Sequence, residues 1–317
     1  MKLHLTSAYD THTGLDALTG VALLDRVGEH ELCADPAEAD AILFVENTHF
    51  DDLLFRQLLQ HVLVADYPDK VYMYNEMDRP WDVLPGLYCC LTRRHHDPTR
   101  HRPFAYLYSP NPYVSNIYSS DRETRYLFSF MGSMSHGCRR TIMQLQHRDA
   151  LLRDTSDFNV WDSEPAEMQV RGREYASTLA ASRFVLCPRG IGTSSIRLYE
   201  TLEAGRVPVI ISDQWAPPPE TDWSFAIQVE ERRIRSIPGL LSAMEGEADN
   251  RGQEARQAWL DNYAPDTLFN TVGNSLASLI DSGHGSRHRR PGTQLNKWLA
   301  GGELLKRTAA QRLLGNQ

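Results

Sequence analysis

The sequence lacks several features that mark other classes of protein. No apolar run approaches the roughly 20 residues of a membrane-spanning helix, and the first residues, MKLHLTSAYDTHTG, lack the continuous apolar core of a signal peptide. The net charge of −8 is the opposite of the basic balance of a general nucleic-acid binder. We therefore expect a cytoplasmic protein that does not bind nucleic acid.

The usual signatures of metal and disulfide sites are also missing. The chain has no D-x-D and no His/Cys/Asp cluster at metal-ligand spacing, which predicts no metal. Five cysteines without a C-x-x-C predict reduced thiols, with the adjacent Cys89 and Cys90 facing opposite ways in a strand. His95, His96 and His101 alternate with arginines that would repel a cation. They predict a basic, solvated loop that could line an acceptor cleft beside Trp81.

The apolar pattern that is present predicts two α/β halves. In the first half the strand candidates are KLHLTS, AILFVE, KVYMYNE and LPGLYCCL, with one helix over 51–63. The polar, turn-rich stretch 108–124 is the expected linker. In the second half a strand is expected over 126–131, and helices are expected near 237–246, 250–262 and 266–281. We predict domains at 1–120 and 121–282, followed by a basic tail at 283–317.

One stretch is more informative than the rest: RFVLCPRGIGTSSIRLYETLEAGRVPVIISDQWAPPPETD, from Arg183 to Asp222. It reads as a buried strand, a loop with two glycines, a helix and a second buried strand. Thr193, Ser194 and Ser195 offer N-cap hydroxyls, and Ala204-Gly205 is the expected helix stop. This order is typical of a loop that binds the phosphates of a nucleotide.

Charge supports that interpretation. Free backbone N–H groups at a helix start attract an anion, and Arg189 and Gly190 precede them in the loop. Arg197 and Glu200 share a helix face, where the cation could extend a phosphate contact and the carboxylate could bind ribose hydroxyls. Taken alone, Arg197 and Glu200 are also typical of a surface ion pair. Together with P-R-G and the serines they favour a diphosphate ligand.

The same residues carry a resemblance. The run FVLCPRGIGTSSIRLYETLEAGRVPVIISDQW resembles the signature of exostosin-type glycosyltransferases. RYLFSFMGSMSHGCRR, residues 125–140, is similar to that family's first donor-domain strand, and Tyr175 and Ser182 match its lead-in. Together these segments cover about 100 residues. YNEMDRPWDVLPGLY resembles the family more loosely in the first half.

The resemblance implies a GT-B fold, in which two Rossmann-like, doubly wound domains face each other across a cleft. It implies an inverting, metal-independent transfer of sugar from a nucleoside-diphosphate sugar to a hydroxyl of a glycan or lipid-linked glycan, with no cofactor. The implied donor contacts begin at Gly132 and Ser133 and continue through Arg139 or Arg140, which a solvated helix start explains equally well. Asp213 stands where the family contacts donor sugar or loop backbone.

The general base is expected in the first half, on a carboxylate where a strand ends. Glu76 and Asp78 follow the strand KVYMYN and rank first and second, with Arg189 as the residue that stabilises the leaving group. Glu46 ranks third, and Asp10 and His12 follow the first strand. Each of these could instead be a loop cap or a surface charge.

The sequence also allows two other functions and one further partner. A non-catalytic nucleotide-sugar or glycan-binding protein could keep the donor loop without the base. A retaining enzyme is disfavoured, because Pro208 stands where its second glutamate would follow Glu200. The tail carries seven lysines and arginines against Glu303 alone, which could rest on anionic lipid or form a disordered basic segment. A surface-polysaccharide enzyme of bacterial style fits the short chain.

Overall fold

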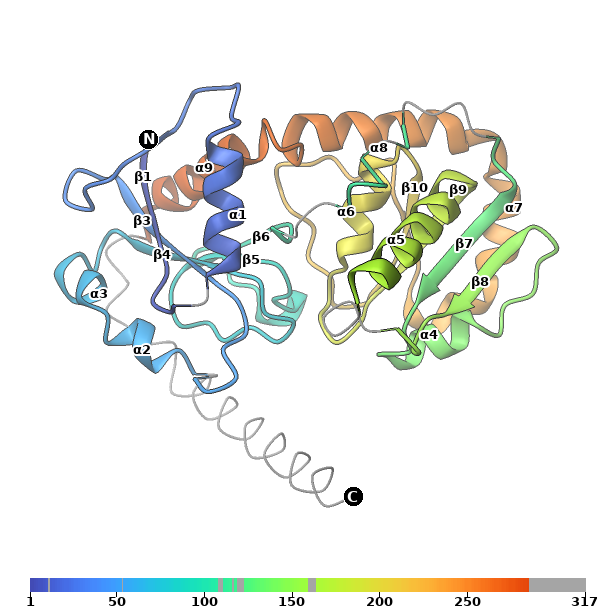
Figure 1. Cartoon of the computed structure of the whole chain (residues 1–317), viewed down its shortest axis with the longest axis horizontal. Coiled ribbons are helices and arrows are strands. Elements are labelled where there is room, and N and C mark those ends of the chain that lie inside the picture. The colour runs from blue at the N-terminus through green and yellow to red at the C-terminus, as the bar shows by residue number, and fades with distance from the viewer. Residues whose placement is uncertain are drawn as a thin grey trace, which may run out of the picture.

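The computed structural model describes residues 1–10, 12–52, 54–107, 111–115, 117–118, 123–158 and 164–284. Two parallel β-sheets, each covered by helices, stand side by side (Figure 1). This is the expected pair of doubly wound α/β domains, so the prediction of a GT-B fold is confirmed.

The first sheet has the strand order β2-β1-β3-β4-β5-β6, with every neighbouring pair parallel. All four predicted strands are present, but the predicted helix over 51–63 is wrong. Two short helices replace it, because Phe55 has a left-handed φ of 54° and His61 is extended before the second helix. The elements are β1 (Lys2–Thr6), α1 (Thr13–Ala22), β2 (Glu31–Leu32), β3 (Ala41–Glu46), α2 (Arg56–Leu59), α3 (Val62–Asp66), β4 (Val71–Asn75), β5 (Gly86–Tyr88), η1 (Arg93–His95) and β6 (His101–Pro103).

The second sheet has the order β11-β10-β9-β7-β8 and is also parallel throughout. The predicted strand near 126–131 and the three predicted late helices are confirmed as β7, α7, α8 and α9. The elements are β7 (Tyr126–Gly132), α4 (Gly137–Ile142), β8 (Ala150–Asp154), α5 (Pro165–Ala180), β9 (Ser182–Pro188), α6 (Ile196–Glu203), β10 (Val207–Ile211), β11 (Ile227–Gln228), η2 (Glu231–Ser236), α7 (Ile237–Ala243), η3 (Glu245–Glu247), α8 (Ala248–Asn262), α9 (Leu268–Leu279) and η4 (Ile280–His284).

Both sheets reverse their strand order once, between β1 and β3 and between β7 and β9. In doubly wound folds, ligands bind outside the carboxyl ends of the strands at such a reversal, because the loops on either side diverge there. In the second domain the reversal lies between Gly132 at the end of β7 and Pro188 at the end of β9. The fold therefore places the motif loop where a ligand is expected.

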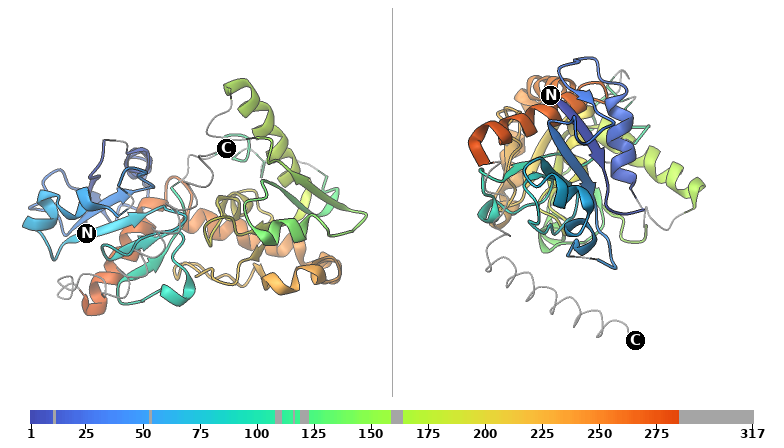
Figure 2. Two further views of the ribbon diagram at one scale, coloured as in Figure 1. Left: turned by 90° about the horizontal axis from the view of Figure 1, so that it is seen from below. Right: turned by 90° about the vertical axis from the view of Figure 1, so that its left-hand side faces the viewer.

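Helix α9 returns to the first domain. α8 runs along the second domain, and α9 then packs against α1, β5 and β6 (Figures 1 and 2). Val272 and Leu276 are fully buried in one hydrophobic cluster with Leu87 and Phe104 of the first domain. This packing joins the two domains at a second place besides the segment that follows β6.

Several predicted features fall partly outside the described residues. The linker predicted over 108–124 includes 108–110, 116 and 119–122, so its boundary stays a prediction. Residues 285–317 of the basic tail also lie outside them. All five cysteines are free, as expected. Among the described helices, none has the length and apolar character needed to cross a membrane.

Candidate active site

The loop between β9 and α6 ends in an uncapped helix start. Ser195 occupies the N-cap position of α6, as predicted, but no side chain caps this helix among the described residues. Thr193 instead donates its hydroxyl to the Cys90 carbonyl of the first domain at 3.1 Å, and Ser194 is buried. The Leu198 N–H donates to the Ser195 carbonyl at 3.0 Å, whereas the N–H groups ahead of it have no acceptor within the helix and can bind an anion.

Arg139 holds this loop through hydrogen bonds to backbone carbonyls. Its Nε donates to the Arg189 carbonyl at 2.9 Å, and Nη1 donates to the Ser133 carbonyl at 2.9 Å. The residue is only 9% exposed, and burial, reinforced by neighbouring Arg197, lowers the pKa of its guanidinium to about 10. Arg139 is therefore not the solvated helix start of the alternative interpretation, whereas Arg140 beside it is exposed.

Arg197 is the second cation beneath the loop. Its Nη2 donates to the Met131 carbonyl at 2.6 Å, and its guanidinium lies 4.8 Å from the centre of the Phe130 ring. Nε and Nη1 are buried and have no hydrogen-bond partner among the described residues. Gly132 makes room for this side chain, because a Cβ there would lie 2.6 Å from Nη2.

Glu200 does not form a surface ion pair with Arg197. Its Oε2 accepts a hydrogen bond of 2.6 Å from the Tyr175 hydroxyl, and burial raises the pKa of the carboxyl. Asp78 and Glu200 are close enough to act electrostatically on Arg139 and Arg197, but among the described residues neither arginine forms an ion pair with a carboxylate. Two neighbouring cations without a direct ion-pair partner form a site that an anion would stabilise.

Arg189 folds back on its own loop. Its Nη2 donates to the Ile191 carbonyl at 3.3 Å, and Nη1 lies 4.0 Å from Oε1 of Glu231. Glu231 is held in turn by Asp213, whose Oδ1 accepts from the Glu231 N–H at 2.9 Å. Asp213 thus contacts the backbone at the start of η2, and its contact with donor sugar or with the loop stays a prediction.

The first domain approaches the loop at Gly192. A Cβ on this glycine would lie 2.7 Å from Oδ1 of Asp78 and 2.5 Å from the Cys90 sulfur. Asp78 is exposed and accepts a hydrogen bond of 2.9 Å from the Tyr106 hydroxyl. A first-domain carboxylate therefore lies against the motif loop of the second domain.

Glu76 lies deeper in the first domain, just after β4. Its Oε1 accepts from the Leu107 N–H at 2.5 Å, and a Cβ on Gly14 of α1 would lie 2.8 Å from its Oε2. The side chain is 8% exposed, and burial raises its pKa to about 7. A carboxyl with that pKa changes charge near neutral pH, as a general base does.

The sequence matches the profile of the Exostosin GT47 domain over residues 60–244, more than half of its length. The chain belongs to the exostosin GT47 family.

Its curated relatives match over shorter stretches. The exostosin domain is 34% identical over 159 residues to the Exostosin-1 homolog of Caenorhabditis elegans, which covers 45% of this chain and 42% of that protein. It is 30% identical over 94 residues to human Ribitol-5-phosphate xylosyltransferase 1, covering 28% of this chain and 20% of that protein. The chain therefore spans less than half the length of these relatives.

Among solved structures, WaaG, described as a glycosyltransferase involved in lipopolysaccharide biosynthesis, aligns over 89% of this chain and all of that one. The sequence identity is 11% and the TM-score is 0.38. So loose a likeness does not bear on the site.

The remaining base candidates precede the matched exostosin domain, and Glu46 and His12 have partners of their own. Glu46 is buried and accepts from the Ala8 N–H at 2.7 Å, from the Ser7 hydroxyl at 3.1 Å and from His49 at 3.1 Å. It thus fastens the loop after β1. Asp10 and His12 are exposed, and His12 contacts Asp16.

The histidine-rich loop was expected to be solvated, and for His101 this is wrong. His101 belongs to β6, is 1% exposed and lies 2.9 Å from Oδ1 of Asp82. Trp81 packs against the hydrophobic cluster of the first domain. His95 is exposed, as predicted.

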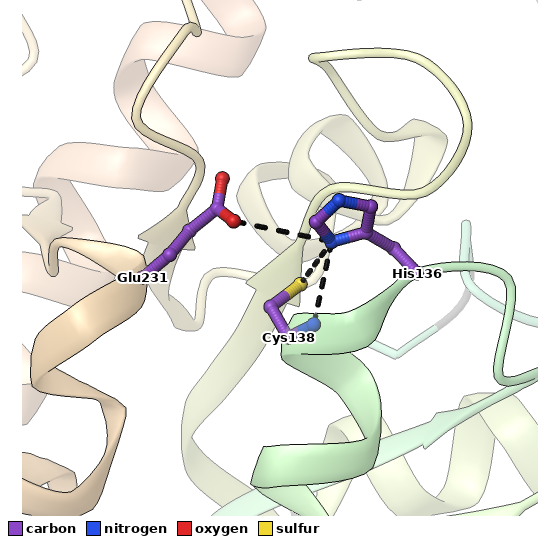
Figure 3. A group of neighbouring side chains, drawn as sticks. All are labelled: His136, Cys138 and Glu231. Carbon is purple, nitrogen blue, oxygen red and sulfur yellow. Dashed lines mark hydrogen bonds and ion pairs between the residues drawn. The ribbon is translucent and has the colours of Figure 1, made fainter.

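Sequence reasoning missed the residues that act across long sequence separations. Tyr106 and Cys90, 2.7 Å apart, lie opposite the motif loop, and Glu231 connects Arg189 with Asp213. His136 and Cys138 stand on the other side of Glu231 (Figure 3). Although His136 and Cys138 lie in the segment 125–140 that resembles the family, no local signal could show that they meet Glu231, nor that Tyr106 meets Cys90.

Proposed function

We propose that the chain is an inverting, metal-independent glycosyltransferase that moves a sugar from a nucleoside-diphosphate sugar to a hydroxyl of a glycan or glycoconjugate. The proposal rests on one observation above the others. Arg139, which is buried, and Arg197, which is half-buried, lie close together at the uncapped start of α6, and neither forms an ion pair with a carboxylate among the described residues. A diphosphate at the loop would be a stronger anionic partner for both and would accept from N–H groups at the helix start.

The remaining residues fit the other needs of the reaction. The acceptor oxygen would bond to the anomeric carbon as the bond to the diphosphate breaks, and the acceptor proton would pass to a carboxylate. Arg189 would stabilise the charge that grows on the leaving diphosphate. Asp78 of the first domain lies beside Gly192 of the loop, so a carboxylate from the first half is present near the proposed donor site.

A panel of nucleotide sugars tests the proposal by thermal shift. A donor at 100 times its dissociation constant should stabilise the fold by about 2.7 kcal/mol. Slow hydrolysis of that donor without acceptor would then separate an enzyme from a nucleotide-sugar-binding protein, because only the enzyme transfers sugar to water. If no nucleotide sugar shifts the melting temperature, the donor-site assignment fails.

Metal independence gives a second expected result. Transfer should continue in EDTA at an unchanged rate, because arginines and backbone N–H groups occupy the place where a metal would neutralise the diphosphate. Rates measured with EDTA, and again with added magnesium or manganese, check this. Loss of transfer in EDTA with rescue by either ion would contradict it.

For the acceptor we propose only a chemical class and a place where it would be met. A sugar or polyol hydroxyl fits a relative whose name describes transfer of xylose to ribitol 5-phosphate. Contact of the basic tail with anionic lipid, where a lipid-linked acceptor would be met, also stays a proposal.

A further inference from the structure

His136, Cys138 and Glu231 converge on one point beside the donor loop. Their ligand atoms all lie within 4.8 Å of one another, and Figure 3 shows Nδ1 of His136 turned toward both other side chains. Nδ1 is 3.1 Å from the Cys138 sulfur and 4.0 Å from Oε2 of Glu231. Tetrahedral zinc separates such ligands by roughly 3.3–3.6 Å, so small side-chain rotations would complete the geometry.

We propose that these three residues bind Zn²⁺ or a similar thiophilic divalent cation, with one coordination position left to water. On binding, the Cys138 thiol would release its proton to solvent as the sulfur–zinc bond forms. Nδ1 of His136 would exchange its long 3.3 Å contact with the Cys138 N–H for the metal. The ligand set of imidazole, thiolate and carboxylate is one that zinc prefers.

The surrounding charge is compatible with a cation. Arg189 and Arg139 lie close by and would repel a site of neutral ligands. Here the thiolate and the Glu231 carboxylate together carry two negative charges, so the occupied site is neutral. The site can also be reached from solvent, since the His136 and Glu231 side chains are 32% and 23% exposed.

The two oxygens of Glu231 face different partners. Oε2 faces His136, whereas Oε1 lies 3.3 Å from the Asp213 N–H and 4.0 Å from Arg189. The metal would therefore take Oε2 and leave the contacts of Oε1 in place. The site is thus distinct from the donor loop although it adjoins it, and its metal has no part in the proposed transfer.

Titration of the full chain with Co²⁺ tests the site, because a thiolate–cobalt bond gives a charge-transfer band in the near ultraviolet. We expect that band in the natural protein, its loss in Cys138→Ser, and a fall in affinity of more than about tenfold in Glu231→Gln, since even second-shell changes cost 10–100-fold. Zn²⁺ should displace the cobalt and abolish the band.

Matched controls address other cysteines and carboxylates. Cys33→Ser changes another free thiol, and Glu230→Gln changes the exposed neighbour of Glu231, which pairs with Arg232. Both should bind Co²⁺ as the natural protein does. A natural protein without the band, or a Cys138→Ser variant that keeps it, would overturn the proposal. Circular dichroism of each variant verifies that it is folded.

Discussion

Replacement of Glu76 by glutamine should lower turnover by about 10²–10⁴-fold while nucleotide affinity stays unchanged, because proton transfer belongs to the transition state. In the natural enzyme, kcat/KM should fall about tenfold per pH unit below a pKa near 7, since the base must be ionised. Steady-state rates across pH, with calorimetry of nucleotide binding, measure both effects.

Two further variants test whether the effect belongs to Glu76. Glu46→Gln removes another buried carboxylate at a strand end, which should weaken the fold but leave the pH profile in place. Asp78→Asn tests the exposed carboxylate beside Gly192. A normal rate in Glu76→Gln together with a collapsed rate in Asp78→Asn would move the base to Asp78.

The stability of Glu76→Gln provides a further check. The folded pKa of Glu76, about 7, exceeds the ordinary glutamate value of 4.5, so the protonated carboxyl favours the fold. That contribution is complete below pH 4.5 and is lost as the pH rises through 7, a change of about 3 kcal/mol at most. Relative to the natural protein, the variant should therefore gain stability between pH 5 and pH 8 rather than unfold.

Replacement of Arg189 by alanine should weaken nucleoside-diphosphate binding by roughly 10–150-fold, the equivalent of a charge-assisted contact of about 1.5–3 kcal/mol. Its guanidinium now lies on the loop near Glu231, and a diphosphate is the stronger partner for it. Turnover should fall as well, because the leaving group loses a cation.

Arg140→Ala is the matched control, since it removes an exposed arginine of α4, next in sequence to Arg139. Calorimetry with a nucleoside diphosphate compares the two variants. Equal affinity in Arg189→Ala and the natural protein would remove Arg189 from the donor site.

The sequence predicted those parts of the fold that depend on local pattern. Strands β3 and β10 are nearly continuous apolar runs, the pattern of parallel strands that are buried on both faces. Gly205, at a φ of 63°, ends α6 where a stop was expected. By contrast, α1 was not predicted, because its threonines and glycines are weak helix formers. The packing of buried Leu18 stabilises this helix in place of local propensity.

The candidate site was predictable in outline and less so in detail. The motif identified the loop, but it could not show that Arg139 is engaged by backbone carbonyls or that Glu200 pairs with Tyr175. Nor could it bring Asp78 to Gly192 across the domain junction. Such contacts join residues that are distant in sequence, and their geometry depends on how whole elements pack.

The return of α9 to the first domain has a mechanical consequence. Residue 1 and the last described residue, 284, both belong to the body built on the first sheet, so the second domain is topologically an insertion into it. A stretching force applied between these two points would first peel α9 from β5 and β6 and would reach the second domain only afterwards. In a single-molecule experiment the second domain should therefore be shielded until the first has opened.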